Sequence, residues 1–272
     1  MISFTKAHAC GNDFLVVTEE AAHDCDKADL TRKLCARNTG VGADGIEFFT
    51  WTGSRTGRIR LYNADGSVAE ISGNGTRCVA AWMARELHSQ PGDNIQIETD
   101  AGLRICRIDD VSSSSAGFQV NVTAGMGVPK IELGSVKLGA ASIAGSRIST
   151  GNPHFVIAVD NGEFNCAGMS WQTIGANICS HADFPNQTNV EFLRVIGPDE
   201  IEIRIWERGV GPTSSSGTGT SASAAAAIAL GLAKSPLTVV APGGAQTVAW
   251  NGPGTELFLT GPAALIAHGE AY

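Results

Sequence analysis

The chain lacks several features that identify common classes of protein. It has no run of about 18 apolar residues, the length that a membrane-spanning helix needs. It has no basic run or stripe and carries a formal net charge of −8, which argues against a nucleic acid or an anionic membrane as partner. Its first 14 residues lack the charged-then-apolar pattern of a secretory signal. We therefore expect a cytoplasmic protein with neither a nucleic acid nor a membrane as its partner.

Disulfide and metal frameworks are also missing from the sequence. The seven cysteines are odd in number and contain no C-x-x-C pair, whereas an oxidised secreted framework is denser and even. We expect reduced thiols, most of them buried as small apolar side chains. No cluster of His, Cys and Asp has the spacing of metal ligands, so we predict no metal site.

Three familiar motifs of phosphate binding and catalysis are absent as well. No glycine turn is followed by the Lys-Ser/Thr of a phosphate-binding loop, and none has the G-x-G-x-x-G pattern of a dinucleotide fold. The G-x-S-x-G elbow of serine hydrolases is not present either.

What the chain does contain is a series of short β-type segments and two helical ones. The β-type segments alternate polar and apolar residues between Gly, Asn, Asp or Pro, as half-buried strands do. They cover residues 14–18, 58–62, 94–99, 118–122, 154–159, 190–196, 200–207 and 256–260. The helical segments run from about Gly75 to His88 and from about Gly219 to Ala233. The second is apolar on nearly every face, so we expect other structure to surround it.

Two glycine-rich turns repeat at a fixed distance. The pattern S-G-x-G-T-x-x-x-A-A occurs at residues 72–81 and again 144 residues later, at 216–225. A Gly-Asn pair precedes each turn, Gly11-Asn12 by 61 residues and Gly151-Asn152 by 65. Two landmarks in the same order predict a duplicated domain. The polar stretch at 111–117 is the expected boundary.

Each turn opens a helical segment and is suited to bind an anion. The first N–H groups of a helix have no partner within the helix, and the positive end of the helix dipole lies behind them. A carboxylate or a phosphate binds well at such a place. The alternative is that the glycines only turn the chain and cap two helices, and a single S-G-x-G would favour that interpretation.

These residues together resemble the diaminopimelate epimerase family along nearly the whole chain. The matching motifs are H-A-C-G-N-D-F at 8–14, Y-N-A-D-G-S at 62–67, S-G-N-G-T-R-C at 72–78, G-N-P-H-F at 151–155, T-N-V-E-F at 188–192, W-E-R-G-V-G-P-T at 206–213, S-G-T-G at 216–219 and P-G-G at 242–244.

The resemblance implies an α+β fold of two pseudo-symmetric domains, each a β-barrel-like sheet wrapped around a central helix. We place the first domain at 1–117 with the tail 263–272, and the second at 118–262. It further implies a homodimeric isomerase with its active site between the domains, which inverts an amino-acid α-carbon without pyridoxal phosphate, metal or any other cofactor. The default substrate is L,L-diaminopimelate, converted to the meso form in lysine biosynthesis.

The resemblance also implies roles for individual residues. Ser72 and Ser216 occupy the two catalytic positions, and His154 supports the site. The turns at Gly73-Asn74 and Gly217-Thr218 hold the α-carboxylate. The remaining substrate contacts are Asn12, Asn63, Asn152, Asn189, Glu207 and Arg208.

The departure from the family pattern is chemical. The family has cysteine at both catalytic positions, where one thiolate removes the α-proton and the opposing thiol donates one. A serine hydroxyl is far less acidic than a thiol and needs a neighbouring base, which the sequence does not identify. Gly45 stands where many members have glutamine. Cys10 and Cys78 are the cysteines nearest the site and weak candidates for replacing the missing thiols.

Three interpretations stay open. The first is an amino-acid epimerase or racemase in which the serines are either native or cysteine replacements. The second is a different isomerase, lyase or cyclase on the same scaffold. The third is a binding homologue without turnover.

Overall fold

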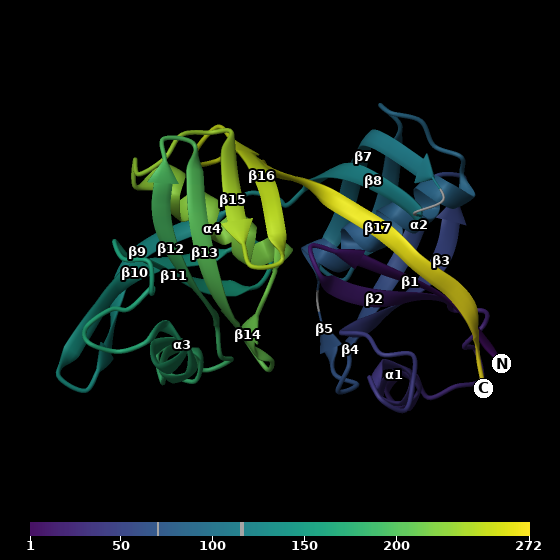
Figure 1. Cartoon of the computed structure of the whole chain (residues 1–272), viewed down its shortest axis with the longest axis horizontal. Helices are drawn as coiled ribbons and strands as arrows, with labels where there is room; N and C mark the ends of the chain where they lie inside the picture. Colours follow the sequence, from purple (N-terminus) through teal and green to yellow (C-terminus); the bar gives the residue numbers. More distant parts are fainter. Residues whose placement is uncertain (70, 115–116) are drawn as a thin grey trace. The chain divides into compact units, whose positions relative to one another are not determined.

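The chain folds as two units that repeat one arrangement of strands and helices (Figure 1). The computed structural model describes residues 1–69, 71–114 and 117–272. Unit 1 comprises Met1–Gly125 with Thr260–Tyr272, and unit 2 comprises Met126–Leu259.

The described residues of unit 1 form two helices and a series of strands. In chain order the elements are β1 (Ile2–Ala9), β2 (Asn12–Thr18), α1 (Lys27–Cys35), β3 (Gly45–Gly53), β4 (Thr56–Asn63), β5 (Val68–Ala69), α2 (Gly73–Glu86), β6 (Asn94–Thr99), β7 (Gly102–Ser114), β8 (Gly117–Gly125) and the greater part of β17 (Leu257–Ala271).

Unit 2 begins with one additional strand, β9, and from β10 to β16 it follows the order that unit 1 has from β1 to β7. Its elements are β9 (Lys130–Leu138), β10 (Ala141–Ser149), β11 (Pro153–Ala158), α3 (Trp171–Cys179), β12 (Asn189–Gly197), β13 (Glu200–Glu207), β14 (Gly211–Thr213), α4 (Gly217–Ala229), β15 (Leu237–Ala241) and β16 (Gly244–Trp250).

Strand pairing confirms the pseudo-symmetry. In unit 1, β2 runs parallel to β3, β3 is antiparallel to β4, and β4 is parallel to β6, which turns back into β7. In unit 2 the same four relations join β11 to β12, β12 to β13, β13 to β15, and β15 to β16. The expected α+β architecture of two similar domains is therefore confirmed.

The last strand closes the barrel of unit 1. β17 pairs with β1 on one side and with β8 on the other. Together with the pairings above and those of β1 with β2 and β7 with β8, it completes a ring of strands around α2. In Figure 1, β17 is the long yellow strand that lies alongside β1.

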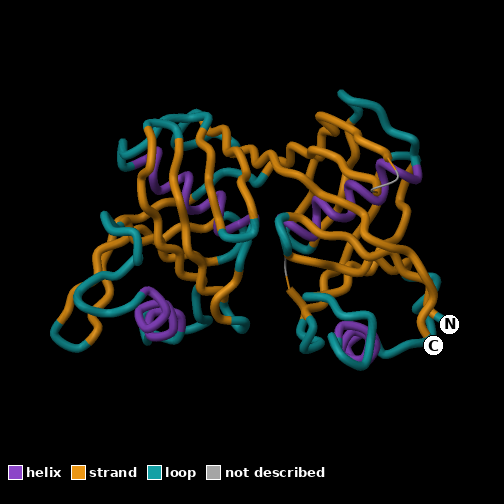
Figure 2. The backbone as a smooth tube through the Cα atoms, in the orientation of Figure 1, coloured by secondary structure: helices purple, strands orange, loops and turns teal. Residues whose placement is uncertain are grey.

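Each unit has an inner core around its central helix, α2 or α4, and an outer core beneath its other helix, α1 or α3. Successive strand residues point to opposite faces of the sheet, so one strand serves both cores. In β2, Phe14 and Val16 pack inward against α2, whereas Leu15 and Val17 pack outward in the cluster that contains Leu34 of α1. Figure 2 shows α2 and α4 among the strands of their own units and α1 and α3 outside them.

The two expected helices are α2 and α4, and both begin two residues earlier than predicted. The glycine turns are themselves the first helical turn, because Ser72 and Ser216 cap the helices. Residues 217–227 of α4 are all buried, so the prediction that other structure surrounds this helix is confirmed. We did not expect α1 and α3, which have only nine residues each.

The structure corrects the domain boundary expected at residue 117. That residue begins β8, which pairs along its length with β7, so a boundary there would divide one hairpin. The serines at 112–114 are strand residues of this hairpin, and residues 115–116 of the polar stretch lie outside the described part. The compact units instead divide at Gly125/Met126, and the returning segment begins at Thr260 rather than at 263.

Candidate active site

Ser72 and Ser216 occupy equivalent places at the starts of the two central helices. Each has an extended backbone, and each Oγ accepts a hydrogen bond from the N–H three residues on, from Gly75 at 3.0 Å and from Gly219 at 3.1 Å. Both serines are half-buried. They therefore act as N-caps of the helices, a role in which serine is among the preferred residues.

Asn12 is held between the helix start and a carboxylate in unit 1. Its Oδ1 accepts a hydrogen bond from Asn74 Nδ2 at 3.2 Å, and its Nδ2 donates to Asp44 Oδ2 at 2.5 Å. Asn74 Oδ1 in turn accepts a bond of 2.6 Å from Arg77, which is fully buried. The amide of Asn12 is thus fixed in orientation from both ends.

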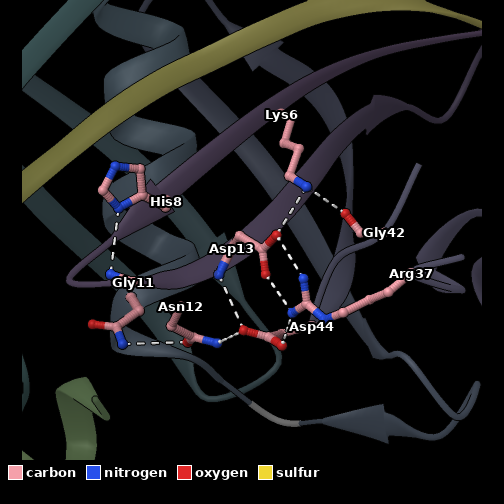
Figure 3. A network of polar contacts seen from close by, with 9 residues as sticks. Lys6, His8, Gly11, Asn12, Asp13, Arg37, Gly42 and Asp44 are labelled. Atoms are coloured by element: carbon pink, nitrogen blue, oxygen red, sulfur yellow. Dashed lines mark hydrogen bonds and ion pairs between the residues drawn. The ribbon is translucent and has the colours of Figure 1, made fainter. Parts of the chain in front are cut away.

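Asp44 belongs to a larger ionic network, which Figure 3 shows. Arg37 bonds both Asp44, at 2.6 Å, and Asp13, at 2.8 Å. Lys6 completes the group 3.0 Å from Asp13. Burial alone would raise the pKa of Asp13, but the hydrogen bonds from Arg37 and Lys6 hold it below its ordinary value. Asp13 therefore stays charged at neutral pH, and Arg37 joins it to Asp44, which holds the amide of Asn12.

A matching chain of contacts leads to the helix start of unit 2. Glu191 Oε1 lies 2.8 Å from His154 Nδ1, and His154 Nε2 lies 2.8 Å from Asn152 Oδ1. Asn152 Nδ2 donates to Thr218 Oγ1 at 3.3 Å, and that hydroxyl lies 3.4 Å from Ser216 Oγ. The link from Asn152 to the second residue of α4 repeats the link between Asn12 and Asn74 at α2.

Asn189 joins two other segments of unit 2. Its Nδ2 donates to the carbonyl of Pro153 at 3.1 Å, and its Oδ1 accepts from the N–H of Arg208 at 2.8 Å. Only its second amide hydrogen is left for a further acceptor. Glu207 ends β13 beside Arg208, whose guanidinium donates to the carbonyl of Asn186. These residues lie near His154, which pairs with Asn189 in the sheet register.

The side chain of Asn63 has a different partner from those of Asn12 and Asn74. It ends β4 opposite Gly45 of β3, and its amide donates to Ser67 at 3.0 Å. A β-carbon on Gly45 would stand 2.6 Å from the carbonyl oxygen of Tyr62. Since real β-carbons do not approach so closely, a glutamine at position 45 would require the backbone to move.

Two buried glutamates were not predicted from the sequence. Glu47 and Glu191 are both fully buried, and they are separated by 144 residues, as are the two serines. A β-carbon on Gly75 would lie 2.0 Å from Glu47 Oε1, and one on Gly219 would lie 2.8 Å from Glu191 Oε1. The second glycine of each motif is therefore needed because a carboxyl group occupies the space. The common repeat distance was the signal that could have identified the pair.

Asp44 and Arg77 were missed as well, and Cys78 is excluded as a replacement acid–base group. Cys78 is fully buried in the inner core of unit 1, and burial raises the pKa of its thiol.

Within residues 1–69, 71–114 and 117–272, no group of three metal-ligating side chains gathers. Over the same residues, no helix is long and apolar enough to cross a membrane.

Comparisons with known proteins identify the family. The family model described as diaminopimelate epimerase matches residues 4–131 and 146–266. The diaminopimelate epimerase of Halothermothrix orenii is 36% identical, over 99% of this chain and 97% of that protein. That of Teredinibacter turnerae is 34% identical, over 99% and 98%. A solved structure of a predicted epimerase from Pseudomonas aeruginosa has the same fold, with 16% identity, coverage of 100% and 99%, and a TM-score of 0.75.

The close fit of the buried carboxyls predicts a graded effect of adding a methyl group. Gly75→Ala should lower the free energy of unfolding by about 1–3 kcal/mol, as overpacking does, and Gly219→Ala should cost less because its contact is longer. Gly162→Ala, at a glycine with open space around it, is the control and should be near neutral. Urea denaturation measures all three, and equal stability of Gly75→Ala and Gly162→Ala would contradict the account.

Burial of Glu47 predicts an unusual pH dependence of stability. Desolvation raises the pKa of Glu47 to about 8 from an ordinary 4.5, so between these values the folded state binds a proton that the unfolded state has lost. The free energy of unfolding should therefore fall as pH rises from 4.5 to 8, by at most about 1.4 kcal/mol per pH unit. Glu47→Gln should remove this part of the slope in urea denaturation at several pH values. An unchanged slope would contradict the prediction.

Proposed function

Because the chain belongs to the diaminopimelate epimerase family, we propose that it holds a diaminopimelate-type amino acid and exchanges the proton on its α-carbon. Family membership makes the chain an isomerase of the epimerase type. In the proposed reaction Ser72 serves one face of the α-carbon and Ser216 the other, and neither pyridoxal phosphate nor a metal takes part.

The observation that carries the proposal is the matched construction of the two helix starts. Each presents the N–H groups of a first helical turn, which bind carboxylates well. On this proposal the turns Gly73-Asn74 and Gly217-Thr218 hold the α-carboxylate of the substrate. Asn12 and Asn152, each tied to the second residue of its helix, are then held ready to contact the substrate.

The remaining contacts belong to the far end of the substrate and to its ammonium groups. We assign Asn63, Asn189, Glu207 and Arg208 to these contacts. The carboxylate of Glu207 suits an ammonium group, whereas the guanidinium of Arg208 suits a carboxylate. We also propose that the protein is cytoplasmic and that it forms a homodimer. A measurement of its mass in solution tests whether it is a dimer.

The serines set the rate of the proposed reaction. Gly75 and Gly219 donate their N–H groups to the serine oxygens, and such bonds stabilise an oxygen that takes on negative charge. A hydroxyl is still a much weaker acid than a thiol, so proton transfer should be slower than with cysteine at the same places. The two positions therefore limit turnover rather than binding.

Binding and exchange measured together test the proposal. L,L-diaminopimelate should bind the protein by calorimetry and gain α-deuterium slowly in deuterated water. The double variant Ser72→Cys/Ser216→Cys should bind it equally and exchange its α-proton about tenfold faster or more, because the pKa of a thiol is ~8.5.

The control for this experiment is Ser142→Cys, which adds a thiol on an exposed serine of β10 and should not change the exchange rate. Absence of both binding and deuterium incorporation, in the protein and in the double variant, would refute the assignment. Binding without exchange in the double variant would favour a binding homologue instead.

A further inference from the structure

Glu47 is a buried acid with no described partner. It faces the interior of the barrel of unit 1, on the same side of β3 as Phe49, and its side chain is fully buried. Neither carboxyl oxygen makes a hydrogen bond within residues 1–69, 71–114 and 117–272. Burying a carboxyl group without a partner costs free energy, so its presence here calls for a role beyond packing.

The carboxyl of Glu47 lies next to Ser72. The position of a β-carbon on Gly75 is 2.0 Å from Glu47 Oε1 and 3.2 Å from the β-carbon of Ser72, so the acid and the serine flank the same glycine. On α2, burial raises the pKa of the Cys78 thiol, and the nearby charge of Glu47 raises it further. Arg77, on the same helix, bonds Asn74 and the carbonyl of Gly73 instead.

Unit 2 shows what such an acid does when it has a partner. Asn152 Oδ1 can only accept a hydrogen bond, so Nε2 of His154 carries a hydrogen in the assigned amide orientation. Nδ1 of His154 and Oε1 of Glu191 then share one proton across 2.8 Å, either on the ring or on the carboxyl. In unit 2 the buried acid is therefore hydrogen-bonded to an imidazole, whereas Glu47 has no such partner among the described residues.

We propose that Glu47 is the proton store of the first half-site, the half that contains Ser72. It is a positioning residue that gives a proton to Ser72 and takes it back. Its counterpart in the second half-site, the half that contains Ser216, is Glu191 with His154. The idea rests on the proposed function. Ser72 Oγ–H gives its proton to the α-carbanion, whose electron pair forms the new C–H bond, and the alkoxide takes the carboxyl proton of Glu47 directly or through one water. Removal of the α-proton runs the same steps in reverse.

The chemistry of the two stores makes the half-sites unequal. The pKa of Glu47, raised to about 8 by burial, keeps this acid protonated at neutral pH, so the half-site of Ser72 begins as a donor. In unit 2 the imidazole and the carboxyl together supply a base as well as an acid. In this proposal unit 2 therefore supplies the base that Ser216 needs, although the sequence did not identify it.

A thiol reporter tests the coupling without relying on turnover. In Ser72→Cys, ionised Glu47 should disfavour the adjacent thiolate, so adding Glu47→Gln should speed alkylation of this thiol by iodoacetamide about tenfold at pH 9, quantified by peptide mass spectrometry. The matched control is Ser216→Cys, whose alkylation should not respond to Glu47→Gln. Identical alkylation profiles with and without Glu47→Gln would overturn the proposal.

Exchange of the substrate α-proton gives the second measurement. Glu47→Gln should lower α-deuterium incorporation about 100-fold and remove the limb of its pH profile near 8, with the affinity for diaminopimelate unchanged. Glu47→Asp should restore part of the rate, which a purely structural role would not predict. A wild-type rate and pH profile in Glu47→Gln would also overturn the proposal.

The outcomes separate this proposal from the proposed function. If the wild-type protein neither binds nor exchanges diaminopimelate, the function fails, while the thiol coupling still decides whether Glu47 serves Ser72. If Glu47→Gln does not fold, Glu47→Met removes the same carboxyl at similar volume and takes its place in both measurements.

Discussion

The constraint on which this structure depends is the burial of the first turn of a helix inside a sheet. The N–H groups of such a turn have no acceptor within the helix and must be satisfied in another way. Ser72 and Ser216 satisfy one N–H group each, and the glycines beside them keep the turn narrow enough for a buried glutamate to approach. The same construction that stabilises the fold therefore leaves N–H groups of a kind that suits an anion, and it places an acid beside a hydroxyl.

Duplication supplies this construction twice, and the two copies have diverged in their polar support. In unit 1 the asparagine that contacts the helix start is held by an ionic network around Asp44 and Arg37. In unit 2 the equivalent asparagine is held by His154, which is itself bonded to Glu191. The scaffold is thus symmetric, whereas the groups able to hold protons are not. An isomerase that removes a proton on one face and returns it on the other can use this difference.

The sequence predicted the fold well because its strongest signals are local. Alternation identified strands such as β6 and β13, and the glycine motifs placed α2 and α4 to within a few residues. It misplaced the domain boundary, because the serines at 112–114 are polar strand residues rather than a linker. It also missed Glu47 and Glu191, since a charged residue in a strand normally faces solvent and its burial depends on the tertiary structure.

In the proposed function both helix starts hold one substrate molecule. The most direct measurement is the NMR titration of the backbone amides of Gly73 and Gly217 with diaminopimelate. The account predicts that both signals shift together along a single saturable curve, because one carboxylate-bearing ligand accepts hydrogen bonds from both turns. A shift confined to one glycine, or two curves with different midpoints, would contradict it.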